Sequence, residues 1–264
     1  MAQFPQTMGG KIMMRFIMAC CCLLGMIGPV AAEEVYQFPD DPDEADFIAN
    51  EVIATFYHEM GHALIDVLQI PVLGKEEDAA DTLSVILMHD IWVEEAATAI
   101  LASDALTYAL RAGDTTQAPD LSAYADVHSL DIQRYYAVVC LFYGANPEAR
   151  KQLAIDLELP EDKIDSCPDE YQYARSAWDT VLQGTEPGPD TYGLVMVEGQ
   201  EGMPLADLLA AEVESINANF GLPEPVYVVV QDCGEANAFY HPDDKTIVMC
   251  NEYAQDLNLL WESH

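Results

Sequence analysis

The chain has 264 residues, of which 51% are hydrophobic and 9% aromatic, so it can bury one sizeable core or two small ones. Its 46 Asp and Glu residues against ten Lys and Arg give a formal net charge of -36. Nucleic acid and anionic membrane surfaces are therefore excluded as expected partners, because both carry negative charge. The acidity indicates a well-solvated surface, with a preference for basic substrates as the alternative.

The N-terminal segment predicts export. Lys11 and Arg15 precede the apolar run FIMACCCLLGMIGPV, and the small residues before Glu33 are typical of a signal-peptidase site. We expect a signal peptide over residues 1–32, cleavage after Ala32, and a secreted or periplasmic mature chain. A retained anchor is the alternative, but the run is short for a bilayer, which needs about 20 residues. A lipoprotein site at Cys20 is a second alternative, although almost no hydrophobic segment precedes it.

Four cysteines remain in the expected mature chain: Cys140, Cys167, Cys233 and Cys250. In an oxidising compartment an even number predicts disulfides, and four cysteines allow three pairings. Proximity in the sequence favours Cys140 with Cys167 and Cys233 with Cys250. A four-cysteine zinc site is the competing interpretation, but no Cys-x-x-Cys spacing supports it.

The hydrophobic pattern predicts a mainly helical α+β fold. The expected helices cover 46–69, a segment beginning at the acidic EEDAAD, and then 92–111, 130–143, 168–183 and 204–219. A strand is expected at 193–198, and two stronger candidates cover 226–231 and 245–250, with 237–240 as a third beside these two in a small C-terminal sheet or hairpin. We expect a single domain over 33–264, with a helical part at 46–183, a linker at about 184–192 and a mixed part at 193–264.

The stretch TFYHEMGHALID carries the strongest chemical signal. Residues four apart lie on one helix face, so His58 and His62 can direct their imidazoles at one metal ion. Glu59, on the adjacent flank, can act as a general base on a water molecule. The alternative is a pair of structural histidines, because a pattern this short also occurs by chance.

The next predicted helix supplies a third ligand. Glu77 and Asp81 are four residues apart, so Glu77 can complete the metal site while Asp81 accepts the second N–H of a ligating histidine. Ala79 and Ala80 let the two helices approach closely. The alternative is that the acidic cluster only caps its helix, where negative charge is favourable.

The segment HSLDIQRYY contains His128, Arg134, Tyr135 and Tyr136. A donor near a metal-activated water can stabilise a substrate oxygen on which negative charge develops, and we take His128 as the candidate. The alternative is that these polar side chains only hold helices together.

Together these residues resemble known families. His-Glu-x-x-His followed by Glu-x-x-x-Asp is similar to the gluzincin metallopeptidases. More closely, HEMGHALI, PVLGKEEDAAD, HSLDIQRYY and DCGEANAFY look like a domain family of unknown function that is described as metallopeptidases (DUF4344-like). That resemblance covers nearly the whole mature chain. It implies a zincin-like fold in which the ligands are His58, His62 and Glu77, with Glu59 as the base and Asp81 behind a histidine.

A second resemblance concerns the segment NAFY. It is similar to the edge-strand segment of neprilysin-like zinc peptidases, which implies substrate binding by Asn237, Ala238 and Tyr240. Here the segment follows the metal-binding helix in the sequence instead of preceding it, and an ordinary disulfide-closed hairpin is the alternative. The function expected is an exported peptidase with one Zn²⁺ that hydrolyses extended peptides or proteins. The alternative is a non-catalytic zinc-containing binding or scaffold protein with the same fold. The sequence does not specify an oligomeric state.

Overall fold

The computed structural model describes residues 35–113 and 115–263. The expected signal peptide and its cleavage site lie outside the described residues. From Val35 onward the chain forms one compact unit with a continuous apolar core. None of the described helices is both long and apolar enough to cross a membrane.

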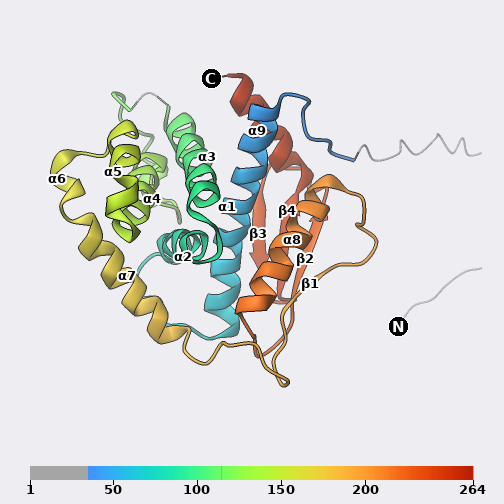
Figure 1. Ribbon diagram of the computed structural model, residues 1–264. Helices are drawn as coiled ribbons and strands as arrows, with labels where there is room; N and C mark the ends of the chain where they lie inside the picture. Colours follow the sequence, from blue (N-terminus) through green and yellow to red (C-terminus); the bar gives the residue numbers. More distant parts are fainter. Residues whose placement is uncertain (1–34, 114, 264) are drawn as a thin grey trace, which may run out of the picture. The chain divides into compact units, whose positions relative to one another are not determined.

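The longest described helix, α1 (Pro42–Val67), runs between the other early helices and the sheet (Figure 1). It begins where the Asp41 carboxylate accepts hydrogen bonds from the backbone N–H groups of Asp43 and Glu44, at 3.0 and 3.2 Å. Pro42 occupies the first position, where a missing N–H costs little. The helix starts at 42 rather than at 46 because this acidic segment supplies a cap. Both of its sides are covered, so most of its residues after Phe47 are buried.

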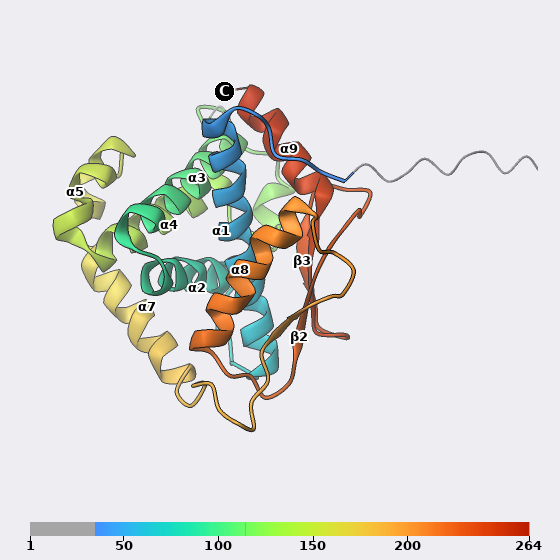
Figure 2. The ribbon, with the colours of Figure 1, turned by 45° about the vertical axis from the view of Figure 1, so that its right-hand side comes forward.

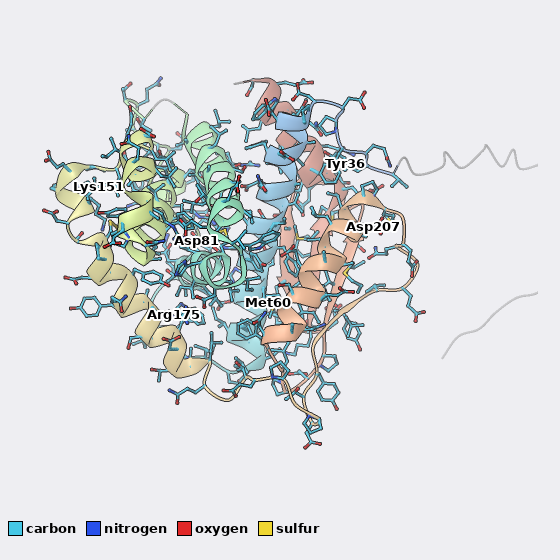
Figure 3. The ribbon with its side chains drawn as sticks, viewed as in Figure 1. Tyr36, Met60, Asp81, Lys151, Arg175 and Asp207 are labelled. Atoms are coloured by element: carbon cyan, nitrogen blue, oxygen red, sulfur yellow. A yellow bond between two sulfur atoms is a disulfide. The ribbon has the colours of Figure 1, made fainter. Side chains whose placement is uncertain are left out.

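A layer of helices covers one side of α1 (Figure 1). It consists of α2 (Glu76–Ile91), α3 (Glu94–Ala112), α4 (Asp131–Ala145), α5 (Pro147–Asp156), α6 (Glu161–Ile164) and α7 (Cys167–Val181). A short 3-10 helix, η1 (Ala123–Ala125), lies in the connection between α3 and α4. Met60 and Asp81 are buried inside the unit, whereas Lys151 lies at its outer surface (Figure 3).

A four-stranded sheet lies on the other side of α1 (Figures 1 and 2). Its strands are β1 (Leu194–Met196), β2 (Val226–Gln231), β3 (Ala238–His241) and β4 (Thr246–Cys250), in the order β1-β2-β4-β3. The first three in that order are parallel, and β3 pairs with β4 in antiparallel register. Helix α8 (Pro204–Asn219) connects β1 to β2, and α9 (Asn251–Glu262) follows β4.

Two disulfides fasten this arrangement. Cys140 on α4 is joined to Cys167 at the start of α7, and Cys233, after β2, is joined to Cys250 at the end of β4. These are the two pairs that proximity in the sequence favoured.

The mainly helical α+β fold predicted from the sequence is confirmed. The hairpin interpretation holds only for β3 and β4, because β1 and β2 join β4 as parallel strands. Three short helices, α5, α6 and α9, were not predicted. The segment expected as a linker is attached to the unit, since Tyr192 pairs with Leu222 and the Gly221 N–H donates to the Thr185 carbonyl.

Candidate metal centre

The two histidines of the HEMGH motif face the same point. His58 and His62 lie one turn apart on α1, and their Nε2 atoms are 3.2 Å from each other. Their rings meet edge to face, with centroids 4.9 Å apart. His58 is buried, so its ring has little freedom to turn away.

Glu77, in the first turn of α2, completes a group of three potential ligands. Its Oε2 atom lies 3.2 Å from His58 Nε2 and 3.1 Å from His62 Nε2. The three ligand atoms all lie within 4.8 Å of one another. Two imidazole nitrogens and one carboxylate oxygen at these separations fit a single metal ion with an open position.

The described residues offer one other such group, formed by Cys233, Cys250 and Glu252. Its two sulfurs are joined in a disulfide, so they are not thiolates and cannot bind a metal as thiolates do. The HEMGH centre is therefore the candidate metal site.

The close packing of α1 against α2 explains how Glu77 reaches the histidines. A Cβ atom on Gly61 would lie 2.9 Å from Ala80 Cα and 3.0 Å from Ala80 Cβ. Only a glycine fits there without displacing backbone, and Ala80 is fully buried against it. The expectation that small residues let these helices approach closely agrees with this contact.

The second ring nitrogen of each histidine also meets a carboxylate. His58 Nδ1 lies 2.7 Å from Asp81 Oδ1, and His62 Nδ1 lies 2.8 Å from Glu76 Oε1. Such contacts fix the tautomer and direct Nε2 at the metal. The contact of Asp81 was predicted from the sequence, whereas that of Glu76 was not.

Asp81 is itself held by Arg134. The guanidinium donates to both carboxylate oxygens, at 2.8 and 2.7 Å, which is the bidentate geometry that Arg forms best. Burial alone would raise the pKa of Asp81, but the hydrogen bonds from Arg134 and His58 outweigh it and hold that pKa well below its usual range. Asp81 thus stays ionised behind His58. The sequence analysis named Arg134 as a polar candidate but did not predict that it binds Asp81.

The carboxylates around the two histidines raise the pKa values of both imidazoles. Burial lowers the pKa of His58, but its hydrogen bonds to Asp81 and Glu77 outweigh that effect and raise the pKa to about 10. The pKa of His62 is also raised, because hydrogen bonds to Glu77 and Glu76 outweigh burial. This surplus of negative charge attracts a cation, and a metal ion must displace these protons when it binds.

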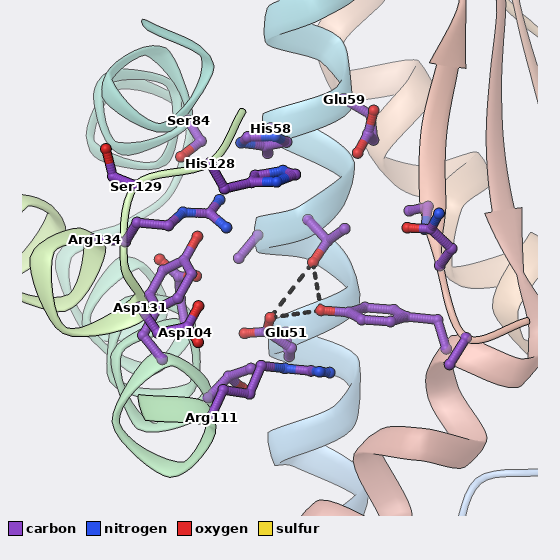
Figure 4. A pocket seen from close by; sticks show the side chains of 18 of the residues that line it. Glu51, His58, Glu59, Ser84, Asp104, Arg111, His128, Ser129, Asp131 and Arg134 are labelled. Atoms are coloured by element: carbon purple, nitrogen blue, oxygen red, sulfur yellow. Dashed lines mark hydrogen bonds between the residues drawn. The ribbon is translucent and has the colours of Figure 1, made fainter. Parts of the chain in front are cut away.

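Glu59 lies on the same turn of α1 as His58, on the side that faces the sheet (Figure 4). It is buried, and its side chain makes no hydrogen bond or ion pair within the described part of the chain. Burial is the largest influence on its pKa, which is raised. It lines both of the cavities that meet at the histidines, of about 610 and 750 Å³. A carboxylate with these properties suits a general base.

His128 approaches the site from the connection before α4. Its Nε2 atom lies 3.1 Å from Glu77 Oε2, and its side chain is 46% exposed. Its segment is fixed to the start of α2, because Lys75 donates to the His128 carbonyl at 2.7 Å and the Ser129 hydroxyl donates to Asp78 at 2.7 Å. The structure therefore places His128 beside the metal centre with an exposed face.

The NAFY segment lies along the same cleft. Asn237 and Ala238 line both cavities, and β3 pairs with β4 on one side only, with no described strand on its other side. Tyr240 lines the larger cavity. Its hydroxyl donates a hydrogen bond at 2.7 Å to Asp66, near the end of α1. The structure thus brings these residues to the site, with Tyr240 contributing its ring.

Fold and site together define a helical protein whose HExxH helix carries a candidate metal centre beside a small sheet, with β3 at one edge. The chain belongs to the family DUF4344, described as "Putative metallopeptidase", whose model matches residues 16–182 and 196–264. It is thus assigned to a class of metal-dependent peptide hydrolases. No curated protein and no solved structure matches the chain.

Proposed function

We propose that the protein is an exported zinc peptidase that cleaves extended peptides or proteins. The observation that carries the proposal is the convergence of His58, His62 and Glu77 beside Glu59. Two ligand atoms of a tetrahedral zinc ion are about 3.3 Å apart, given Zn–N and Zn–O distances of roughly 2.0–2.1 Å. The three separations of 3.2, 3.2 and 3.1 Å are close to that value.

The side chains around the centre supply the remaining chemistry. A bound zinc ion acts as a Lewis acid that polarises the scissile carbonyl and makes water acidic enough to attack it near neutral pH. Glu59 takes the proton that the attacking water loses and delivers it to the departing amine. Its raised pKa makes it a stronger base than an exposed carboxylate. His128 donates a hydrogen bond to the carbonyl oxygen as negative charge develops there.

The substrate is held as an added strand on β3. An edge strand offers unpaired backbone N–H and C=O groups, which bind any extended peptide regardless of its sequence. Asn237 and Ala238 stand where β3 meets both cavities, so a peptide paired there passes the metal centre. Endopeptidase and exopeptidase action both fit this geometry.

Export accounts for the two disulfides, because such bonds form in oxidising compartments. Residues 1–32 are then the signal peptide and 33–264 a single domain. N-terminal sequencing of exported material should give Glu33 as the first residue. A mature chain that retains residues 1–32 would contradict this part of the proposal.

The decisive experiment compares the parent with Glu59→Gln. The parent should carry about one zinc per chain and cleave members of an unbiased peptide library, whereas Glu59→Gln should keep the zinc and lose cleavage, because the base is not a ligand. Equal cleavage by both proteins would remove the mechanism. A parent that binds zinc and cleaves nothing would favour the non-catalytic scaffold.

A further inference from the structure

The cavity of about 610 Å³ extends from the metal centre to a second polar cluster that the mechanism does not use. One end is lined by His58 and Glu59, and the other reaches Glu51, Asp104 and Tyr253. Glu51 precedes His58 by two turns of α1, or about 10 Å along the helix axis. Figure 4 shows Glu51 on α1 facing Asp104 across this space.

Glu51 is buried but only half satisfied. Glu51 is 3% exposed. Its Oε1 atom accepts hydrogen bonds from the hydroxyls of Tyr253 at 2.8 Å and Thr55 at 3.4 Å (Figure 4). Its buried Oε2 atom and Thr107 Oγ1 make no well-formed hydrogen bond with a described residue, although Thr107 lies close enough to lower the pKa of Glu51. A buried polar atom without a partner destabilises the protein, so its retention needs a reason.

Asp104, on α3, has even fewer partners. It is 5% exposed, and its side chain makes no hydrogen bond or ion pair with any described residue. Burial is the largest influence on its pKa, which is raised, and the charge of Glu51 raises it further. Two buried carboxyl groups thus line one cavity, and neither forms an ion pair with a described residue, although the charge of Arg134 lowers the pKa of both and that of Arg111 lowers the pKa of Glu51.

The two arginines at this cavity are already engaged. Arg134 is bound bidentately to Asp81, and Arg111 donates to Asp256 at 2.7 Å. The acidic residues that line the same cavity are more numerous: Glu51, Glu59, Asp104, Asp126 and Asp131. Burial favours the protonated forms of Glu51 and Asp104 while the cavity is empty. A cation that enters favours their ionised forms, because its charge is poorly screened there, so its binding releases protons.

A metal ion is a poor occupant of this end. Glu51 and Asp104 belong to no group of three described His, Cys, Asp or Glu side chains with ligand atoms within 4.8 Å of one another. Hard metal ions need more oxygen ligands than two carboxylates provide. An ammonium or guanidinium group needs only hydrogen-bond acceptors, which the carboxylates and the hydroxyls of Thr107 and Tyr253 supply.

We propose that this cavity is a specificity pocket that accepts a Lys or Arg side chain of the peptide, with its cationic end between Glu51 and Asp104. The inference rests on the proposed function, because it assumes a peptide backbone held at β3. The long aliphatic stems of Lys and Arg carry the charge away from the backbone and toward the second cluster. The substrate class is thus a peptide with a basic residue near the scissile bond.

Binding to a protein that cannot turn over tests the pocket separately from catalysis. In zinc-loaded Glu59→Gln, fluorescence anisotropy would compare peptides that carry Lys, Gln or Glu at each position in turn. At one position the Lys peptide should bind at least about tenfold more tightly than the Gln peptide, and the Glu peptide should bind most weakly. Adding Asp104→Asn or Glu51→Gln should bring the Lys-to-Gln ratio toward one.

Glu212→Gln is the matched control. Glu212 is equally buried, accepts from the Tyr57 hydroxyl at 2.7 Å and lines neither cavity, so its amide variant should keep the ratio. Asp104→Asn should melt at the same or a higher temperature, because it removes an unpaired buried carboxylate. Glu51→Gln provides the second test if Asp104→Asn fails to fold.

Three results would overturn the pocket: equal binding of Lys and Gln peptides at every position, a ratio that both variants preserve, or no binding of any peptide. Failure of the proposed catalysis would give a different set of results. In that case the parent cleaves nothing, while the preference for basic peptides persists in the binding experiment.

Discussion

Gly61 packs against Ala80 so closely that a single added methyl group would lie 2.9 Å from the Ala80 Cα atom. Gly61 stands between the two histidines on α1, and Ala80 stands between Glu77 and Asp81 on α2. This one contact sets the distance between the helices that carry the candidate ligands. Ligand geometry and helix packing are therefore coupled at the centre of the motif.

Gly61→Ala should lower both stability and metal affinity. Alanine favours a helix over glycine by roughly 0.5–1 kcal/mol, but the new methyl group must displace backbone on α2, and such overpacking costs about 1–3 kcal/mol. Urea unfolding and zinc titration measure the two effects. Gly74→Ala is the matched control, because nothing lies within 4 Å of a Cβ atom there. A Gly61→Ala protein as stable and as metal-binding as the parent would show that the contact does not control the site.

Substitutions in the first two turns of α2 should separate ligands from supporting residues. Glu77→Ala should be isolated largely free of metal, whereas loss of a residue behind a ligand weakens metal binding by about 10–100-fold. Asp81→Ala should show that weaker effect, because Asp81 is buried behind His58. Glu76→Ala should show the smallest loss of the three, since the Glu76 side chain is 52% exposed.

Zinc content after purification and competition with a chelator provide the measurements for this series. Glu95→Ala, an exposed acid in the first turn of α3, is the control and should bind zinc like the parent. If Glu76→Ala empties the site while Glu77→Ala leaves it filled, the ligand assignment is wrong.

The sequence predicted the parts of the site that depend on local periodicity. His58 and His62 share a face because they are four residues apart on one helix, and the same spacing selected Glu77 with Asp81. The approach of Glu76 to His62 was missed. It depends on how the start of α2 meets α1, which helical spacing within α2 does not determine.

The second cluster was missed for a similar reason. Glu51 lies on the same face of α1 as His58, which was a usable signal, but Asp104 comes from α3 and enters the cavity only through tertiary packing. In the fold, the parallel pairing of β1, β2 and β4 also depends on long-range contacts. Strand propensity identified these segments without specifying their neighbours.

His128→Gln should lower kcat by about 10²–10³-fold with little change in KM, because an oxyanion donor acts mainly in the transition state. The zinc content should stay near that of the parent. His241→Gln, at an exposed histidine that lines neither cavity, is the control and should retain kcat. A loss of activity that follows a loss of zinc would instead show that His128 acts by positioning Glu77, which its Nε2 atom contacts at 3.1 Å.

Glu51 should make the metal-free protein less stable as the pH rises from about 5 to 7. Burial raises the pKa of Glu51 from 4.5 to about 7, and hydrogen bonds from Tyr253 only partly offset this. The charged groups that face it are Asp104, Arg111 and Arg134. Below pH 4.5 the carboxyl group is protonated in both states, so it carries no penalty. Between pH 4.5 and 7 it ionises in the unfolded chain but not in the folded one, so folding loses stability, and above pH 7 the loss is complete.

Urea unfolding in EDTA at pH 5, 6, 7 and 8 tests this prediction. The quantity to compare is the difference in unfolding free energy between the parent and Glu51→Gln, because the contributions of groups that titrate alike in both proteins cancel. Each tenfold change in proton affinity corresponds to about 1.4 kcal/mol. The stability of Glu51→Gln relative to the parent should therefore grow with pH and level off above 7. Glu252→Gln is the control, since hydrogen bonds from the Cys233 and Gly234 N–H groups lower the pKa of Glu252. The stabilisation by Glu252 is fully present above pH 4.5, so the difference in unfolding free energy between the parent and Glu252→Gln should stay constant over the range. A difference for Glu51→Gln that is equally constant would mean that Glu51 is not held protonated by burial.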